Sequence, residues 1–217
     1  PELLNMICQY GRAKEVSVKN CPKLKLYRCY GNPDIKSVDL TGCEALDEIN
    51  LDGAGIESLV IPDNEPTLWY VNIHGNNLTS VDLSGYKALT ALHCGNAQKL
   101  ASVKYPVSIK EIYHFNNPLL ETVDVSGLSA LTTLWSYADE GDGYHCGMKN
   151  LVFSGNQNLT VVRAFRTQME SVDIRSCADH MTEAWFDANP SLKTITKRVG
   201  QIIDDLHVDS GCEVREL

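Results

Sequence analysis

A repeat about 11 residues long constrains this chain more than any other feature. Apolar residues recur as φ-x-x-φ-x-φ, where φ is apolar, as in Ile35-Val38-Leu40, Leu78-Val81-Leu83 and Leu120-Val123-Val125. Copies begin at residues 3, 13, 24, 35, 46, 56, 68, 78, 89, 100, 109, 120, 131, 148, 159, 169, 181 and 192. A short, fixed period is typical of a stacked solenoid, in which each unit buries its apolar edge against its neighbours.

Each copy is too short for a helix. Its last two apolar positions are two residues apart, which is the spacing of side chains on one face of a strand. Residues that favour sharp corners follow the copies, for example Gly31-Asn32-Pro33, Gly75-Asn76-Asn77 and Ser126-Gly127. The sequence therefore predicts short strands joined by tight corners.

The copies alternate between two types, so the full coil is about 21–22 residues long. Asp-type copies end in V-D-L-S-G or a close variant, as in residues 38–42, 81–85 and 123–127. Asn-type copies read L-x-x-L-x-L/C-x-x-N, and their asparagine follows eight residues after the copy begins; these asparagines are Asn32, Asn76, Asn117 and Asn189.

This pattern resembles the leucine-rich repeat, in the short form found in bacterial secreted and surface proteins. The resemblance implies a leucine-rich-repeat solenoid, a right-handed coil of short parallel β-strands with few or no helices. We expect about nine coils over residues 1–197, an insertion near 138–147 and a C-terminal cap at 198–217, within a single domain. The family also implies that the Asn-type strands line the concave face.

Aromatic residues are distributed unequally between the two types. Outward side chains are expected two, four and six positions after each copy begins, which gives 27 positions for each type in nine copies. In the Asp-type copies none of these is aromatic, and many are serine or aspartate. In the Asn-type copies eight are aromatic, namely Tyr30, Tyr70, Tyr113, Phe115, Trp135, Tyr137, Phe165 and Trp185.

We therefore predict a ligand-binding face on the Asn-type strands. Its residues are Tyr70, His93, Tyr113, Phe115, Trp135, Tyr137, Arg163, Phe165 and Trp185. Tyr113, Trp135, Arg163 and Trp185 should form one row, with Phe115, Tyr137 and Phe165 beside it. Large aromatic side chains are typical of binding surfaces, and an arginine among them can stack or donate hydrogen bonds. The alternative is a ladder of rings that only stabilises the sheet.

Other polar clusters give weaker signals. The insertion at 138–146 should stand at the rim of this face; Asp139, Glu140 and Asp142 could bind Ca²⁺, but a solvated acidic loop is the simpler interpretation. His74 and His93 lie on adjacent Asn-type copies without a third metal ligand. His114 falls at an inward position, where we expect a core histidine. We predict no metal and no cofactor.

The eight cysteines include no C-x-x-C pair. Cys8, Cys29 and Cys94 occupy the third apolar position of Asn-type copies and are expected to fill space in the core. Cys8 and Cys29 would lie on adjacent coils, as would Cys21 and Cys43, and adjacent coils allow a disulfide without requiring one. The sequence leaves their oxidation state open.

Charge and motifs narrow the function. The net charge of −9 argues against a nucleic-acid partner, and no apolar run is long enough for a transmembrane segment. No common catalytic motif is present, so we predict that the chain is not an enzyme. We expect a non-catalytic recognition module that binds a protein; the alternatives are a carbohydrate-binding surface module and a structural spacer in a cell-surface assembly. The resemblance implies a bacterial extracellular or cell-surface location, with the signal segment absent from this chain and a lipid anchor as one option for the precursor.

Overall fold

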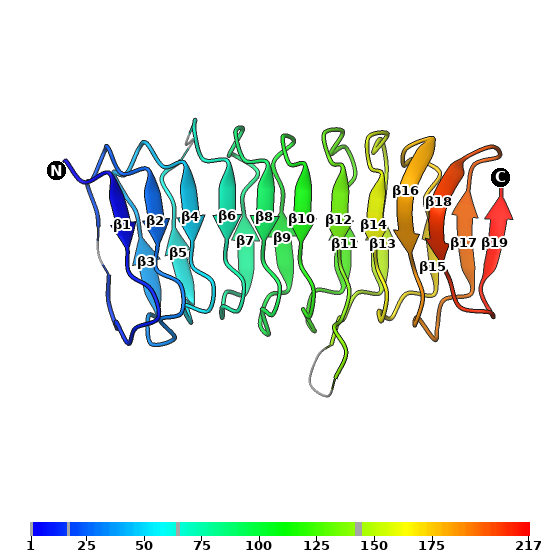
Figure 1. Cartoon of the computed structure of the whole chain (residues 1–217), viewed down its shortest axis with the longest axis horizontal. Helices are drawn as coiled ribbons and strands as arrows, with labels where there is room; N and C mark the ends of the chain where they lie inside the picture. The colour runs from blue at the N-terminus through cyan, green and yellow to red at the C-terminus, as the bar shows by residue number, and fades with distance from the viewer. Residues whose placement is uncertain (1, 17, 64–65, 142–144) are drawn as a thin grey trace. The chain divides into compact units, whose positions relative to one another are not determined.

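The computed structural model describes residues 2–16, 18–63, 66–141 and 145–217 (Figure 1). Contacts divide the chain into two compact units, residues 1–106 and 107–217. Each unit is a parallel β-solenoid, and the described residues contain no helix, which confirms the predicted fold class. Neither this division nor the strand pairing tests the prediction of a single domain.

In the first unit, alternate strands belong to different walls of the coil. The Asn-type wall is formed by β1 (Asn5–Ile7), β2 (Leu26–Arg28), β4 (Glu48–Asn50), β6 (Tyr70–Asn72) and β8 (Ala91–His93), which pair in parallel in that order. The Asp-type wall consists of two parallel pairs, β3 (Ser37–Asp39) with β5 (Ser58–Val60) and β7 (Ser80–Asp82) with β9 (Ser102–Lys104).

The second unit repeats this arrangement. Its Asn-type wall is formed by β10 (Glu111–Tyr113), β12 (Thr133–Trp135), β14 (Val161–Arg163), β16 (His180–Trp185) and β18 (Ile202–His207). Its Asp-type wall contains β11 (Thr122–Asp124) paired with β13 (Asn150–Val152), and β15 (Ser171–Asp173), β17 (Thr194–Lys197) and β19 (Glu213–Glu216) paired in that order.

The core lies between the two walls and is built from the apolar positions of the repeat. Leu46, Ile49 and Leu51 of one Asn-type copy are all fully buried, as are Leu131 and Leu134 of another. His114 is also fully buried, which confirms its predicted inward position. Burial lowers the pKa of its imidazole to about 4, because the charged form would lose its hydration in the core.

Buried asparagines tie each corner to the preceding coil. The Asn76 side-chain amide donates to the Leu51 carbonyl at 2.7 Å, and its oxygen accepts from the Ile56 amide at 2.9 Å. Asn189 does the same in the second unit, with its amide 2.7 Å from the Ala164 carbonyl. These contacts satisfy corner backbone groups that the strand ladder leaves unpaired.

Residues 198–217 add another coil to the second unit. β18 pairs in parallel with β16, and β19 pairs in parallel with β17. Ile203, Leu206 and Val214 point inward in this coil but are only half-buried, whereas Met181 and Ala184 one coil earlier are fully buried. Whether this segment acts as a cap stays a prediction.

Two further expectations concern cysteine chemistry and the membrane. All eight cysteines are free thiols, and Cys29, Cys43 and Cys94 are fully buried. Burial raises the pKa of the Cys94 thiol to about 12, which keeps it protonated and unreactive at neutral pH. In the described parts of the chain, no helix has the length and apolar character needed to cross a bilayer.

Candidate functional site: an aromatic strip on the second unit

The strand register of the second unit brings four predicted site residues into one row. Tyr113 on β10 is opposite Trp135 on β12, which is opposite Arg163 on β14 and then Trp185 on β16. Parallel in-register strands hold equivalent side chains roughly 4.8 Å apart, so each side chain meets the next. The predicted row is confirmed as an arrangement, whereas its role in binding stays a prediction.

Arg163 is the centre of this row. Its guanidinium carbon lies 4.3 Å from the ring centroid of Trp135 and 4.1 Å from that of Trp185, so the cation stands between two indole rings. Its Nε donates to Glu183 Oε2 at 2.8 Å. Two cation–π contacts and a charge-assisted hydrogen bond therefore fix the orientation of the guanidinium.

A second row of rings runs beside the first. Tyr137 stacks between Phe115, at a centroid distance of 5.5 Å, and Phe165, at 4.3 Å, with interplanar angles of 12° and 15°. The rows touch where Trp135 approaches Tyr137 and where Phe165 approaches Trp185. We call Tyr113, Phe115, Trp135, Tyr137, Arg163, Phe165 and Trp185 together the aromatic strip.

Mutual packing leaves the aromatic strip half-buried. All seven residues have intermediate exposure, and the Arg163 side chain is 23% exposed. Burial raises the pKa of Tyr113 and of Tyr137, so both phenols are neutral at physiological pH. The rings therefore stabilise one another, as the ladder interpretation expects, and still remain partly exposed to solvent.

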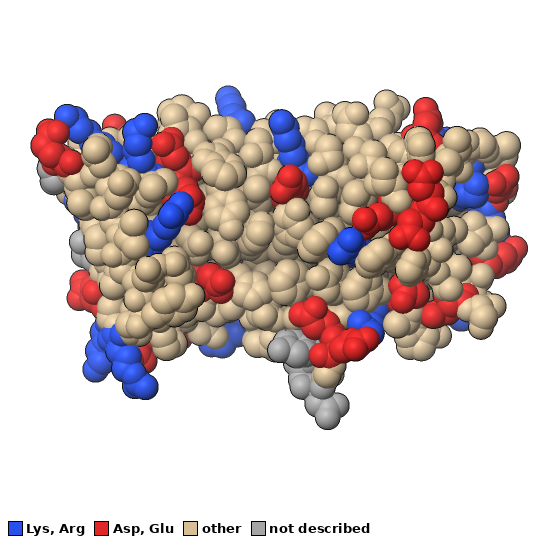
Figure 2. All heavy atoms as spheres, viewed as in Figure 1, with Lys and Arg blue, Asp and Glu red and all other residues tan. Residues whose placement is uncertain are grey.

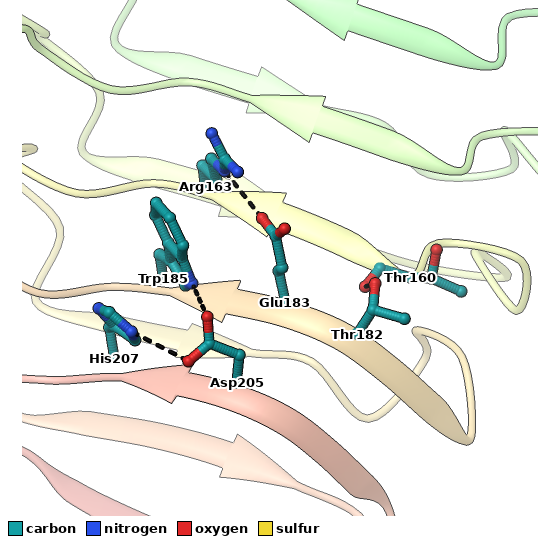
Figure 3. Close-up of polar contacts among 7 residues, drawn as sticks. All are labelled: Thr160, Arg163, Thr182, Glu183, Trp185, Asp205 and His207. Atoms are coloured by element: carbon teal, nitrogen blue, oxygen red, sulfur yellow. Dashed lines mark hydrogen bonds and ion pairs between the residues drawn. The ribbon is translucent and has the colours of Figure 1, made fainter.

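Three neighbours of the strip were missed by sequence reasoning (Figure 3). His207 on β18 stacks on Trp185 at 4.9 Å and extends the first row by one strand. Asp205 accepts a hydrogen bond from Trp185 Nε1 at 2.9 Å and also contacts His207, while Glu183 holds Arg163. Counting one further coil of 22 residues from residue 181 places residues 205 and 207 at outward positions, but the weaker repeat pattern there predicts a cap.

The two indole N–H groups differ in their partners. Trp185 Nε1 donates to Asp205, whereas Trp135 Nε1 is shielded from solvent and has no hydrogen-bond acceptor among the described residues. Leaving a donor shielded without an acceptor costs about 1–3 kcal/mol. The strip therefore contains one unmade hydrogen bond at its centre.

The first residues of the insertion, Asp139 and Glu140, contact residues that neighbour the strip. Asp139 exchanges two hydrogen bonds with the Asn116 side chain, and Glu140 pairs with Arg166, which also approaches the Phe165 ring. The chain returns at Gly147, where a Cβ atom would lie 2.0 Å from the Pro118 carbonyl oxygen, so only glycine fits.

A cleft of about 640 Å³ opens beside the insertion, lined by residues that include Asp139, Glu140, His145 and Gln168. Asp142, one of the three acidic residues that could have bound Ca²⁺, lies outside the described residues. The remaining described residues contain no group of three or more histidine, cysteine, aspartate or glutamate side chains arranged to hold a metal ion.

Two predicted site residues, Tyr70 and His93, belong to the first unit. Their rings lie 5.3 Å apart and meet edge to face. They are not in register, because Tyr70 is opposite Ala91 and His93 is opposite Asn72. His74 Nε2 lies 2.8 Å from the Asn96 amide nitrogen. Tyr70 and His93 therefore form a contact pair in the first unit that is not part of the aromatic strip.

The sequence matches no described protein family and no curated protein. Among solved structures, the chain is similar to the functional domain of InlJ from Listeria monocytogenes, which includes a cysteine ladder, with 18% identity and a TM-score of 0.47. That alignment covers 100% of this chain and 50% of the InlJ chain, so this chain spans about half the length of that structure.

A second similar structure is a leucine-rich repeat protein from Bacteroides ovatus, with 13% identity, a TM-score of 0.23 and coverage of 100% of this chain and 92% of that one. Both similar structures are leucine-rich repeat proteins, the class that the repeat pattern resembles. Similarities this distant carry no argument about function. The functional argument therefore depends on the geometry of the strip.

Proposed function

We propose that the chain is a non-catalytic interaction module that binds a protein partner through the aromatic strip. The observation that carries this proposal is the row in which Arg163 stands between Trp135 and Trp185 while all three remain partly exposed. Tryptophan, tyrosine and arginine dominate the binding energy of protein interfaces. Mutual packing holds these side chains in place before binding, which lowers the entropic cost of ordering them when a partner binds.

The ring geometry favours a protein over a sugar. Carbohydrates stack on the flat faces of aromatic rings, but Tyr137 is covered by Phe115 on one side and Phe165 on the other. Trp185 is covered likewise by Arg163 and His207. The ring surface that stays partly exposed therefore suits the side chains of a polypeptide better than the flat face of a sugar ring.

The spacer alternative requires only that the rings stabilise the coil. The strip does contribute to stability, but this role alone does not require Arg163 and the acidic residues around it at a half-exposed surface. We place the interaction outside a bacterial cell or on its surface, because the repeat resembles that of bacterial secreted and surface proteins.

Loss of two rings tests the proposal. The Trp135→Ala/Trp185→Ala variant and the wild-type chain are used to capture proteins from surface extracts of the source organism. Trp69→Ala is the matched control, because Trp69 is 47% exposed and belongs to the first unit. We expect a protein retained by wild type and by the control to be lost from the double variant, with circular dichroism showing that all three chains remain folded.

Capture of the same proteins by the double variant would contradict the proposed site. A glycan array tests the sugar alternative in parallel. Saccharide binding that quenches the fluorescence of wild type, and not that of the double variant, would favour a carbohydrate ligand over a protein.

A further inference from the structure

Carboxylates gather at one end of the aromatic strip. Figure 2 shows acidic side chains collected over β16 and β18. The outward positions of these two strands and of the residues directly after them contain five carboxylates, namely Glu183, Asp187, Asp204, Asp205 and Asp209, and no lysine or arginine. The nearest cation on this wall is Arg163 on β14.

Most of this negative charge has no cationic partner. Glu183 pairs with Arg163, whereas Asp204 contacts His180 at 2.8 Å, and Asp205 contacts His207 at 3.0 Å and the indole N–H of Trp185. Among the described residues, neither Asp204 nor Asp205 forms an ion pair with a lysine or an arginine. A neutral imidazole donates a hydrogen bond but does not cancel a charge. The Asp204 and Asp205 side chains are 54% and 49% exposed, so both remain accessible to a partner.

The other end of the strip has a different character. On β10, on β12 and directly after them, the half-exposed side chains include those of Tyr113, Phe115, Trp135 and Tyr137, and Glu111 is the one carboxylate among the outward positions. The Asn-type wall of the second unit therefore changes from aromatic to acidic along the direction in which its strands are stacked. A bound chain that crosses the strands would meet both surfaces.

We propose that the partner segment bound by the aromatic strip carries lysine or arginine side chains, which lie against Asp204, Asp205 and the free oxygen of Glu183, next to apolar or aromatic side chains that lie against β12 and β14. This inference depends on the proposed function and adds the chemistry of the partner. Charge complementarity supports it, because opposite charges across an interface speed association and fix the register of the bound chain.

The experiment uses random dodecapeptides displayed on phage and selected on the whole immobilised chain. The library is first depleted on the Trp135→Ala/Trp185→Ala chain, which removes peptides that bind by charge alone. We expect the recovered peptides to be enriched in lysine and arginine next to apolar residues, relative to the starting library.

A neutralised variant identifies the carboxylates responsible. Asp204→Asn/Asp205→Asn removes both charges and leaves one acceptor oxygen at each position, so residue 205 retains one of the two oxygens that contact Trp185 and His207. The variant should bind the recovered peptides about 3- to 20-fold more weakly, with a smaller loss at high salt. The matched control, Asp124→Asn/Glu170→Gln, removes the same charge from the exposed face of the Asp-type wall. It should change binding less than about 2-fold.

The outcomes separate the two proposals. Recovered peptides that require the tryptophans but lack excess lysine and arginine would overturn this inference and leave the proposed function standing. A cationic preference that survives in the neutralised variant would also overturn it. Failure to recover any peptide that depends on Trp135 and Trp185 would overturn both.

Discussion

The two walls of the second unit have similar backbones but different outward side chains, aromatic on the Asn-type wall and largely acidic or small and polar on the Asp-type wall. Both consist of short parallel strands joined by tight corners. On the Asn-type wall the outward rings contact the next coil, as Tyr113 contacts Trp135. On the Asp-type wall the aspartates accept hydrogen bonds from their own turns, as Asp124 does from the Ser126 amide and Asp173 from the Arg175 amide.

This difference shows that the repeat fixes where strands lie, while the outward residues decide how much side-chain contact is added to the strand pairing between coils. A ring that touches the next coil adds roughly 0.2–1 kcal/mol of cross-strand stabilisation per pair. An aspartate that bonds within its own turn stabilises only that turn. The Asn-type wall should therefore be the stiffer of the two, which is the property that the proposed binding role needs.

On the Asn-type wall, the volume of a buried side chain varies inversely with that of the outward side chain directly after it. The buried residue before each ring of the second row is small or polar, as in His114-Phe115, Ser136-Tyr137 and Ala164-Phe165. One coil later the order is reversed, with Phe186 buried and Asp187 outside. The Asn-type wall thus moves apolar volume to its surface in the three coils that contain the second row, whereas the Asp-type wall keeps Val125 and Ile174 buried.

The largest effect is expected where the two walls meet, at a corner. Asn189→Ala removes the hydrogen bonds that the side-chain amide donates to the Ala164 and Phe186 carbonyls. It also removes the side-chain oxygen that accepts a hydrogen bond from the Thr167 backbone amide. Leaving these buried backbone groups unpaired should lower the free energy of unfolding by about 3–4 kcal/mol in urea titration. The control Asn158→Ala loses one exposed hydrogen bond to Ser129 and should cost less than about 0.5 kcal/mol. Equal losses would mean that corners do not bind the walls together.

The second prediction compares two buried side chains, His114 on the Asn-type wall and Val125 on the Asp-type wall, which occupy equivalent positions in neighbouring copies. The pKa of His114 is lowered by burial to about 4, below the unfolded value of about 6.5. Between these pH values the unfolded chain binds more protons, so stability falls as pH falls, by up to about 3 kcal/mol. Urea titrations at several pH values should show this loss in wild type and a flatter profile in His114→Val. Identical profiles would contradict it.

The sequence predicted the fold well because each inward position has a single requirement. Leu46, Ile49 and Leu51 must be apolar to be buried, and Asn76 must reach carbonyls of two coils, so the repeat is visible without a structure. The row containing Trp135, Arg163 and Trp185 followed from register alone.

The partners of that row could not be predicted in the same way. Asp205 and His207 come from a segment whose repeat pattern is weak, and their contacts with Trp185 depend on side-chain rotamers. Register says which residues are neighbours and does not say whether ring faces are covered. The half-buried state of Tyr137, on which the proposed preference for a protein ligand depends, is a property of packing and not of spacing.

The third prediction compares the same outward position on the two walls. Trp185→Ala removes the stack on His207, the contact with Arg163 and the hydrogen bond to Asp205, and should cost about 2 kcal/mol of unfolding free energy. Thr196→Ala, four residues into the next Asp-type copy, should cost less than about 0.5 kcal/mol. Thermal unfolding of both variants measures the difference, and similar midpoints would show that the rings do not couple the coils.

The smallest effect is expected for exchanging one cation for another. Arg163→Lys keeps the charge but loses the planar group between Trp135 and Trp185, and should cost about 1 kcal/mol in urea titration. Arg175→Lys, on the exposed Asp-type wall, keeps its partner Asp173 and should cost less than about 0.3 kcal/mol. If stacking holds the indoles in place, near-ultraviolet circular dichroism should change in the first variant and not in the second. An unchanged spectrum in Arg163→Lys would mean that the positive charge alone orders the row. Stacking of the guanidinium would then not explain why the Asn-type wall is more ordered than the Asp-type wall.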